Sequence, residues 1–158
     1  MARQYQGAIL IPANPSRLQN PALGSILLHA RHAERYGKVF WDVFPPTQDR
    51  PGPFPHQNVS VAYFYDVIDG LVRYKAKVHD VFSGRELSSV KDGKRYLLKH
   101  RRDYYGAHSW GYWVLLSDFS ELENPVRLRK LRLVSNGAYV RQVRRYAMVR
   151  DPHLKPIL

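Results

Sequence analysis

Cysteine is absent from this chain of 158 residues, and acidic side chains are scarce beside basic ones. Without cysteine there is no disulfide bond, no thiolate nucleophile and no cysteine-ligated zinc, which fits a reducing compartment. Apolar runs are also short. Residues 8–12 form one of the longest, whereas a membrane-spanning helix needs roughly 20 apolar residues. We therefore expect a cytoplasmic protein with no membrane partner.

The motifs of common enzyme classes are missing as well. The sequence contains no P-loop, no dinucleotide-binding glycine fingerprint, no nucleophile elbow and no paired-carboxylate motif. His29, His32 and Glu34 are residue types that bind metals, but the two histidines lack a further ligand at a spacing typical of a metal site. The sequence therefore predicts no catalysis, no cofactor and no metal.

Positive charge dominates what is present. The formal net charge is +12, and residues 94–158 carry 14 Lys or Arg against five Asp or Glu. Arginine outnumbers lysine 17 to 8, and its planar fork suits phosphate contacts and stacking on rings. This asymmetry predicts a localised basic patch and a polyanionic partner.

Aromatic residues share segments with these cations. The chain has three tryptophans and eleven tyrosines, and its densest region runs from Arg101-Arg102-Asp103-Tyr104-Tyr105 to Trp110-Gly111-Tyr112-Trp113. Rings stack on bases and guanidinium groups neutralise phosphates. We therefore expect a nucleic-acid partner, DNA or RNA.

A hydrophobic content of 44% predicts one folded domain, residues 1–150. The remaining residues 151–158 resemble the start of a linker, which predicts further domains after Leu158. Proline-rich residues 45–55 predict a loop, and Asp118 or Ser120 a helix cap. Branched and aromatic runs predict strands, at residues 7–12, 24–30, 38–44, 59–67, 71–78, 95–99 and 110–116. Alternating side chains suggest further strands at residues 126–129 and in parts of 139–149.

The clearest local structure is a hairpin at Asp69-Gly70, a dipeptide that supplies the positive φ angles of a two-residue turn. If Ile68 faces Leu71, alternation places one set of side chains on a shared apolar face. That set is Val61, Tyr63, Tyr65, Val67, Val72, Tyr74, Ala76 and Val78. The opposite face then holds Phe64 with Arg73, Lys75 and Lys77. Asn136-Gly137 predicts a second hairpin turn.

In chain order these segments resemble a PUA-like domain of the EVE type. The counterparts are an N-terminal strand, a glycine-led strand, a strand pair with a tight turn, a tryptophan-bearing strand with a valine-leucine stretch, and a final strand. They fall at residues 7–12, 24–30, 59–78, 110–116 with 121–128, and 139–149. The resemblance implies a mainly β (α+β) fold, a curved β-barrel of about five to seven strands with a few short helices and a cleft that accepts a nucleotide.

Relatives of that type read modified bases in DNA or RNA, some as the N-terminal specificity module of a modification-dependent restriction system. Rings can grip an extruded base, and Asp42, next to Trp41, can accept a hydrogen bond from its amino group. The alternatives are a core position for each ring and an ion pair with arginine for Asp42. The candidate contacts are Trp41, Asp42, Tyr63, Phe64, Tyr65, Arg73, Lys75, Lys77, Arg101, Arg102, Tyr104, Trp110 and Trp113.

The leading hypothesis is a nucleic-acid-binding module without catalysis of its own, and in its narrower form a reader of a modified or flipped base. Two alternatives stay open. One is a small basic RNase or toxin-like nuclease that uses residues such as His100, Arg101 and His108. The other is a protein-interaction module whose basic face docks an acidic partner. Sequence leaves open whether the further basic runs, at residues 127–132 and 141–145, converge with the first.

Overall fold

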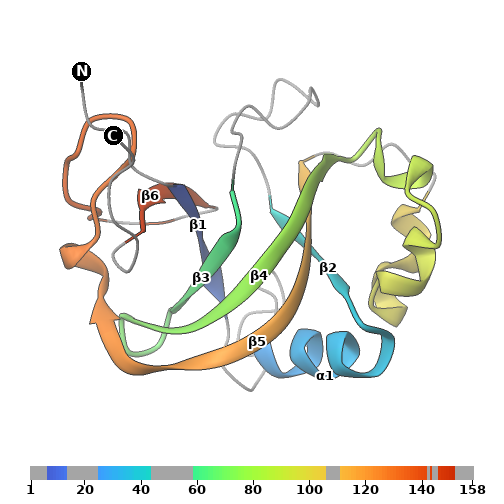
Figure 1. Cartoon of the computed structure of the whole chain (residues 1–158), viewed down its shortest axis with the longest axis horizontal. Coiled ribbons are helices and arrows are strands. Elements are labelled where there is room, and N and C mark those ends of the chain that lie inside the picture. Colours follow the sequence, from blue (N-terminus) through green and yellow to red (C-terminus); the bar gives the residue numbers. More distant parts are fainter. Residues whose placement is uncertain are drawn as a thin grey trace.

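Six strands form one mixed sheet in the order β2-β5-β4-β3-β1-β6, which curls into a half-barrel (Figure 1). The computed structural model describes residues 7–13, 25–43, 59–105, 111–141, 143 and 146–151. The strands are β1 (Gly7–Ala13), β2 (Val39–Val43), β3 (Val61–Asp66), β4 (Leu71–Ser83), β5 (Tyr112–Arg127) and β6 (Ala147–Arg150). Between them lie α1 (Ile26–Tyr36) and the 3-10 helices η1 (Leu87–Ser89), η2 (Gly93–Tyr96), η3 (Lys99–Tyr104) and η4 (Leu128–Lys130).

The curvature comes from the two longest strands. β4 and β5 have 13 and 16 residues and pair antiparallel along most of their length, and Figure 1 shows both sweeping across the molecule. Their register shifts three times, between Val72 and Tyr74, between Lys75 and Lys77 and between Val78 and Asp80. Such bulges bend a strand and increase its twist. The expected mainly β fold, a curved sheet with a few short helices, is confirmed.

The predicted strand at residues 24–30 is wrong, because this segment begins helix α1. Ile26, His29 and Ala33 are its buried residues, a helical spacing that buries one face and leaves Leu27 and Leu28 exposed. Ser25 caps the helix by accepting a hydrogen bond from the Leu28 amide at 3.4 Å. The apolar composition of the segment suggested a strand, whereas the spacing of its buried residues, at intervals of three and four, is that of a helix.

Two further predictions are corrected. The predicted strand at residues 95–99 is the end of η2 and the start of η3. The helix cap expected at Asp118 or Ser120 does not exist, because β5 continues through both residues to Arg127, with Asp118 at φ 54°. Pairing with the long strand β4 overrides the local preference of these residues. The predicted loop at residues 45–55 lies outside the described residues.

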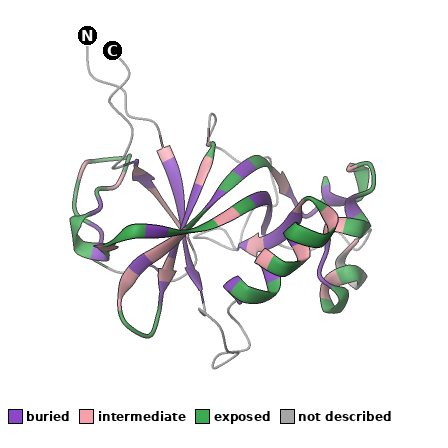
Figure 2. Cartoon of the chain, turned by 60° about the horizontal axis from the view of Figure 1, so that its bottom comes forward, coloured by how far each residue is buried: buried purple, intermediate pink, exposed green. Residues whose placement is uncertain are grey.

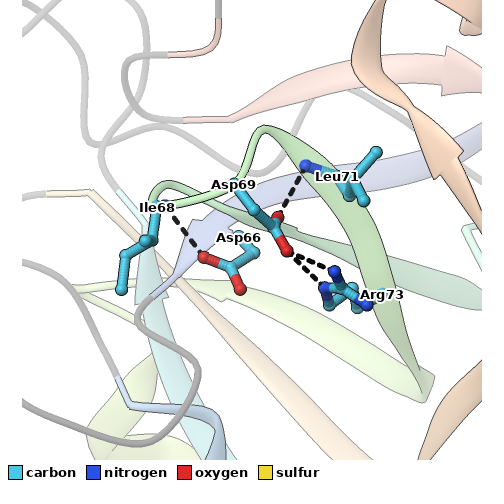
Figure 3. Close-up of polar contacts among 5 residues, drawn as sticks. All are labelled: Asp66, Ile68, Asp69, Leu71 and Arg73. Atoms are coloured by element: carbon cyan, nitrogen blue, oxygen red, sulfur yellow. Dashed lines mark hydrogen bonds and ion pairs between the residues drawn. The ribbon is translucent and has the colours of Figure 1, made fainter.

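Both predicted hairpins are present, but the first does not have the predicted two-residue turn, because residues 67–70 separate β3 from β4 and only Gly70 of the Asp69-Gly70 pair has a positive φ. Asn136-Gly137 lies between Arg132 and Tyr139, which form a β-bridge, and the Gly137 amide donates to the Leu133 carbonyl at 2.9 Å. The other turn joins β3 and β4 (Figure 3). There the Gly70 amide donates to the Asp66 carbonyl at 3.0 Å, and the Asp66 carboxylate accepts from the Ile68 amide at 2.8 Å.

The predicted register of the β3-β4 hairpin is wrong by one residue. The structure pairs Ala62 with Ala76 and Phe64 with Tyr74. The connection is longer than the predicted two-residue turn. It consists of residues 67–70, and the Gly70 amide donates back to the Asp66 carbonyl across it. A one-residue slip moves every side chain of a strand to the other face. Phe64 therefore shares a face with Ala76 instead of with Lys75 and Lys77.

Gly70 provides a test of this turn. Its φ is 75°, and no atom lies within 4 Å of the position that a Cβ would occupy, so a substitution costs backbone strain alone. We expect Gly70→Ala to lower the free energy of unfolding by about 1 kcal/mol, because a side chain disfavours left-handed backbone. Gly70→Asn should lose less, since asparagine tolerates that region better. Urea unfolding measures both, and an Ala variant as stable as the parent would contradict the turn.

The core is divided between the two faces of the sheet. On one face, Trp41, Phe64 and Val114 pack with Ile26 and Ala33 of α1. On the other, Phe40 and Trp113 pack with residues of the η1-η3 region, namely Leu87 and Leu97. Figure 2 shows the buried residues concentrated along the strands and the exposed ones on the outer sides of the helices. A third cluster, around Leu10, Tyr63 and Val149, lies where β1, β3 and β6 meet.

Candidate nucleic-acid interface

Four of the aromatic candidates lie in the core. The exposed fractions are 2% for Trp41, 0% for Phe64, 1% for Trp113 and 3% for Tyr63. The Trp41 ring lies between His29, with centroids 3.9 Å apart, and Phe64, at 4.7 Å. The His29 ring stacks on Trp41 and the Phe64 ring is tilted against it, so the Trp41 ring is covered by the protein itself. Phe40 and Trp41 are neighbours on β2 and point to opposite faces of the sheet. Both are buried, because α1 covers one face and the η1-η3 region covers the other.

The polar groups beside these rings have partners inside the protein. The Tyr63 hydroxyl donates to the buried Asp151 carboxylate at 2.8 Å, and burial, followed by this hydrogen bond, raises the pKa of Tyr63. Asp42 lies 3.7 Å from the Arg101 guanidinium, which is the ion pair weighed as the alternative to base contact. Tyr65 is half-buried and packs against the cluster around Leu10.

The hairpin cations lack the ring expected beside them. Lys75 and Lys77 are exposed on β4, but Phe64 faces the other side of the sheet. Arg73 makes a hydrogen-bonded ion pair with Asp69 (Figure 3). Only the backbone of Tyr104 is described, within η3, and Trp110 lies outside the described residues.

A pocket of about 390 Å³ lies instead between α1 and η3. On the helix side it is lined by residues three or four positions apart, which a helix presents on one face. The η3 side reaches it because Leu97 packs on one face of the sheet and Leu98 on the other, so the η2-η3 segment passes around the edge strand β2. The lining residues are Leu28, Arg31, His32, Arg35, Tyr36, Leu98, Lys99, His100 and Arg102.

The pocket is strongly basic. Arg31 and Arg35 from α1 and Lys99 and Arg102 from η3 bring four permanent positive charges to it, and all four residues are exposed. No aspartate or glutamate occurs among the described lining residues, and none of the four cations forms an ion pair with a carboxylate in the described part of the chain. Unpaired cations that converge on a concave surface attract anions, and phosphate oxygens above all.

Tyr36 organises the wall formed by α1. The Arg35 guanidinium carbon lies 5.2 Å from its ring centroid and that of Arg95 lies 5.8 Å away, distances typical of cation-π contacts. The His32 ring contacts the same tyrosine, with centroids 4.5 Å apart. These contacts hold charged groups in place before any ligand arrives, which lowers the entropy lost on binding.

His32 is fixed and neutral near pH 7. Its Nε2 lies 2.9 Å from the Arg95 carbonyl, and because a carbonyl only accepts, Nε2 carries the proton and Nδ1 is the acceptor. Desolvation lowers the pKa of His32, opposed in part by this hydrogen bond, and the charges of Arg102 and Arg35 lower it further. The pocket therefore combines four cations with a neutral imidazole and, from the other side, His100.

A second basic surface lies at the opposite end of the sheet, where η4 and the following hairpin are placed in Figure 1. Residues 124–141 contain no acidic residue. Tyr139 is 54% exposed, and the Arg132 guanidinium lies over its ring at 4.5 Å and donates to its hydroxyl at 2.6 Å. Four exposed cations lie near this pair in the sequence, namely Arg127, Arg129, Lys130 and Arg141. The basic run at residues 127–132 therefore lies away from the run that contains Arg101 and Arg102.

Of the predicted contacts, the pocket contains Arg102 alone, and Arg101 adjoins it. Sequence reasoning missed the α1 wall because it assigned the start of this helix to a strand. The signal was the spacing of Leu28, His32 and Tyr36 at intervals of four, with Arg31 and Arg35 at the same interval. Read as a helix, this spacing predicts one face that carries two guanidinium groups, an imidazole and a phenol.

Comparisons of the chain with family models, with curated proteins and with solved structures gave no match. Within the described ranges, no helix has the length and apolar character that crossing a membrane requires. The same part of the chain has no group of three or more His, Cys, Asp or Glu side chains placed to hold a metal ion. His29, considered above as a ligand, is buried and hydrogen-bonded through Nδ1 to the Ser25 carbonyl at 2.7 Å.

Proposed function

We propose that this protein binds nucleic acid and that the pocket between α1 and η3 is a principal contact. One observation supports this most directly: four permanent cations line one concavity and have no described carboxylate among them. The charge of the whole chain, +12, adds a long-range attraction for a polyanion. An acidic protein offers the same sign of charge, but a nucleic acid places one negative charge on every residue of its backbone, which is a far denser and more regular array.

Kinship with PUA-like domains of the EVE type is part of this proposal. The curled six-stranded sheet is compatible with it. The narrower function, reading a modified or flipped base, requires rings with an accessible face, whereas Trp41, Phe64, Trp113 and Tyr63 are buried and Tyr65 is half-buried. We therefore propose the broader function, with the phosphates recognised by the pocket.

The proposal predicts which charges carry binding. We expect Arg31→Ala combined with Arg102→Ala to weaken binding of a short single-stranded RNA at least tenfold, about 1.4 kcal/mol, because both guanidinium groups line the pocket. The log of the parent's affinity should fall with log salt by about 0.7 per phosphate contacted. Fluorescence anisotropy across a salt series measures both.

The matched control is Lys75→Ala with Lys77→Ala, which removes two exposed cations from β4 outside the pocket. It changes the net charge equally and should change the affinity far less. Equal losses in the two double variants would show that binding follows net charge and not the pocket. An affinity independent of salt would overturn the proposal.

A second candidate, cleavage of RNA, has one observation in its favour. Two histidines, His32 and His100, line the same cationic pocket, and imidazole pairs serve as general base and general acid. Arg101, named with His100 as a candidate, pairs with Asp42, and His108 lies outside the described residues. End-labelled RNA incubated with the protein separates the two functions, because shortened products mean cleavage and an intact shifted band means binding alone.

A further inference from the structure

The charge of the pocket exceeds that of one backbone phosphate. An internal phosphodiester carries a single negative charge, whereas a phosphomonoester carries about −1.5 to −2 at pH 7 and has three strong acceptor oxygens. Arg31, Arg35, Lys99 and Arg102 approach from two sides, and no described lining residue is acidic. A dianion with three free oxygens matches this arrangement better than a diester whose other two oxygens continue into the strand.

The size of the pocket points the same way. At about 390 Å³ it lies near the lower end of ligand pockets, which span about 300–1,000 Å³. A single nucleotide fits such a volume. A strand that is bound along its length instead needs an open groove that follows the backbone and rings on which successive bases stack.

The apolar part of the lining can take the nucleoside. Leu28, which is 40% exposed, and Leu98, which is 7% exposed, both line the pocket together with the cations. The Tyr36 ring serves another purpose, because Arg35, Arg95 and His32 all contact it. The tyrosine therefore positions the guanidinium group of Arg35, and the leucines are left to contact a sugar or base.

We propose that the pocket binds a phosphomonoester, the phosphorylated end of a nucleic-acid strand, with the terminal nucleoside against Leu28. The cations Arg31, Arg35, Lys99 and Arg102 surround the phosphate. This inference rests on the proposed function, since it specifies which part of the nucleic acid the pocket recognises.

The test compares ends of one RNA sequence. Three oligonucleotides of about eight residues carry a 5′-phosphate, a 3′-phosphate or hydroxyls at both ends, and anisotropy at physiological salt gives each dissociation constant. We expect one of the two phosphorylated forms to bind at least tenfold more tightly than the hydroxyl form, since one added dianion contributes charge-assisted hydrogen bonds. The oligonucleotide that binds more tightly identifies whether the pocket recognises the 5′ end or the 3′ end of the strand.

Two variants locate the preference. Arg31→Ala with Arg102→Ala should reduce the ratio between phosphorylated and hydroxyl forms to near one, while Lys75→Ala with Lys77→Ala should keep the parent's ratio. Circular dichroism and thermal unfolding establish that both fold, as expected for exposed side chains. A ratio of one in the parent would refute the preference for ends and leave nucleic-acid binding intact.

Adenosine monophosphate and adenosine, measured by calorimetry, separate the two proposals further. Binding of the monophosphate but not of the nucleoside, with no oligonucleotide bound, would support the phosphomonoester site and overturn the proposed function. If neither the monophosphate nor any phosphorylated strand binds in preference to its unphosphorylated form, the phosphomonoester site is wrong.

Discussion

Trp41→Ala should unfold much of the population or leave a strongly destabilised protein, with a loss of about 3–5 kcal/mol in the free energy of unfolding. Trp41 is 2% exposed and its ring lies between the rings of His29 and Phe64. Truncation removes the burial of a large ring and leaves a cavity that the neighbouring β-strands cannot close. Since whole domains are stable by only about 5–15 kcal/mol, this is a large fraction of the total.

Chemical unfolding monitored by far-ultraviolet circular dichroism measures this loss. Trp41→Phe is the matched control, because it keeps a ring between His29 and Phe64 and should lose clearly less. A base-gripping role for Trp41 predicts the reverse pattern, namely a stable Trp41→Ala variant that has lost discrimination between bases. A stable variant would therefore contradict the packing described here.

Acidification should destabilise the protein by about 2 kcal/mol between pH 7 and pH 5 through His29 alone. Burial lowers the pKa of His29 to about 3, and this effect outweighs the hydrogen bond to the Ser25 carbonyl, which raises it. In the unfolded chain the pKa is near 6.5. Between these two pKa values the imidazole is protonated in the unfolded state and neutral in the folded state, so the free energy of unfolding falls as the pH falls. Above about pH 7 His29 is neutral in both states and has no effect on the pH dependence.

His29→Phe isolates this contribution, since phenylalanine keeps a flat ring against Trp41 and does not titrate. The free energy of unfolding of this variant should depend less steeply on pH between about 6.5 and 4 than that of the parent, by up to about 1.4 kcal/mol per pH unit. Val39→Ala is the control, because Val39 is a buried residue of β2 that belongs to the same core cluster as Trp41 and does not titrate. It should lose stability at every pH and keep the parent's slope, and identical slopes in parent and His29→Phe would refute the buried neutral imidazole.

Strand composition was readable along much of the chain. β1, β2, β3 and β4 fall where branched and aromatic runs predict strands, and Asp69-Gly70 and Asn136-Gly137 both lie at turns. These signals are local: a side chain that favours extended backbone, or a glycine that accepts positive φ, acts within a few residues. The errors also have local causes, since residues 24–30 and 95–99 are apolar or mixed runs too short to tell a strand from a helical turn.

The basic pocket between α1 and η3 lies away from most of the residues that the sequence suggested as contacts. Arginine beside an aromatic ring, the combination that the sequence suggested, occurs in this pocket on α1 and η3, around Tyr36 and Arg102. Trp41 and Trp113, the rings with the strongest sequence signal, lie in the core. Burial of the largest apolar side chains contributes the most free energy to folding. Which rings stay accessible depends on which faces of the sheet are covered, and α1 on one face and the η1-η3 region on the other cover both faces beside β2.

By itself, the amino-acid sequence determined the excess of positive charge, the lack of thiol chemistry, the strand-rich composition and the hairpin turns, because each depends on residue type or on near neighbours. Tertiary structure alone decided the register of β3 against β4, the burial of the tryptophans and the meeting of Arg31 with Arg102. Those two arginines are 71 positions apart in the chain, and only the passage of η2 and η3 around the edge strand β2 brings them to one pocket.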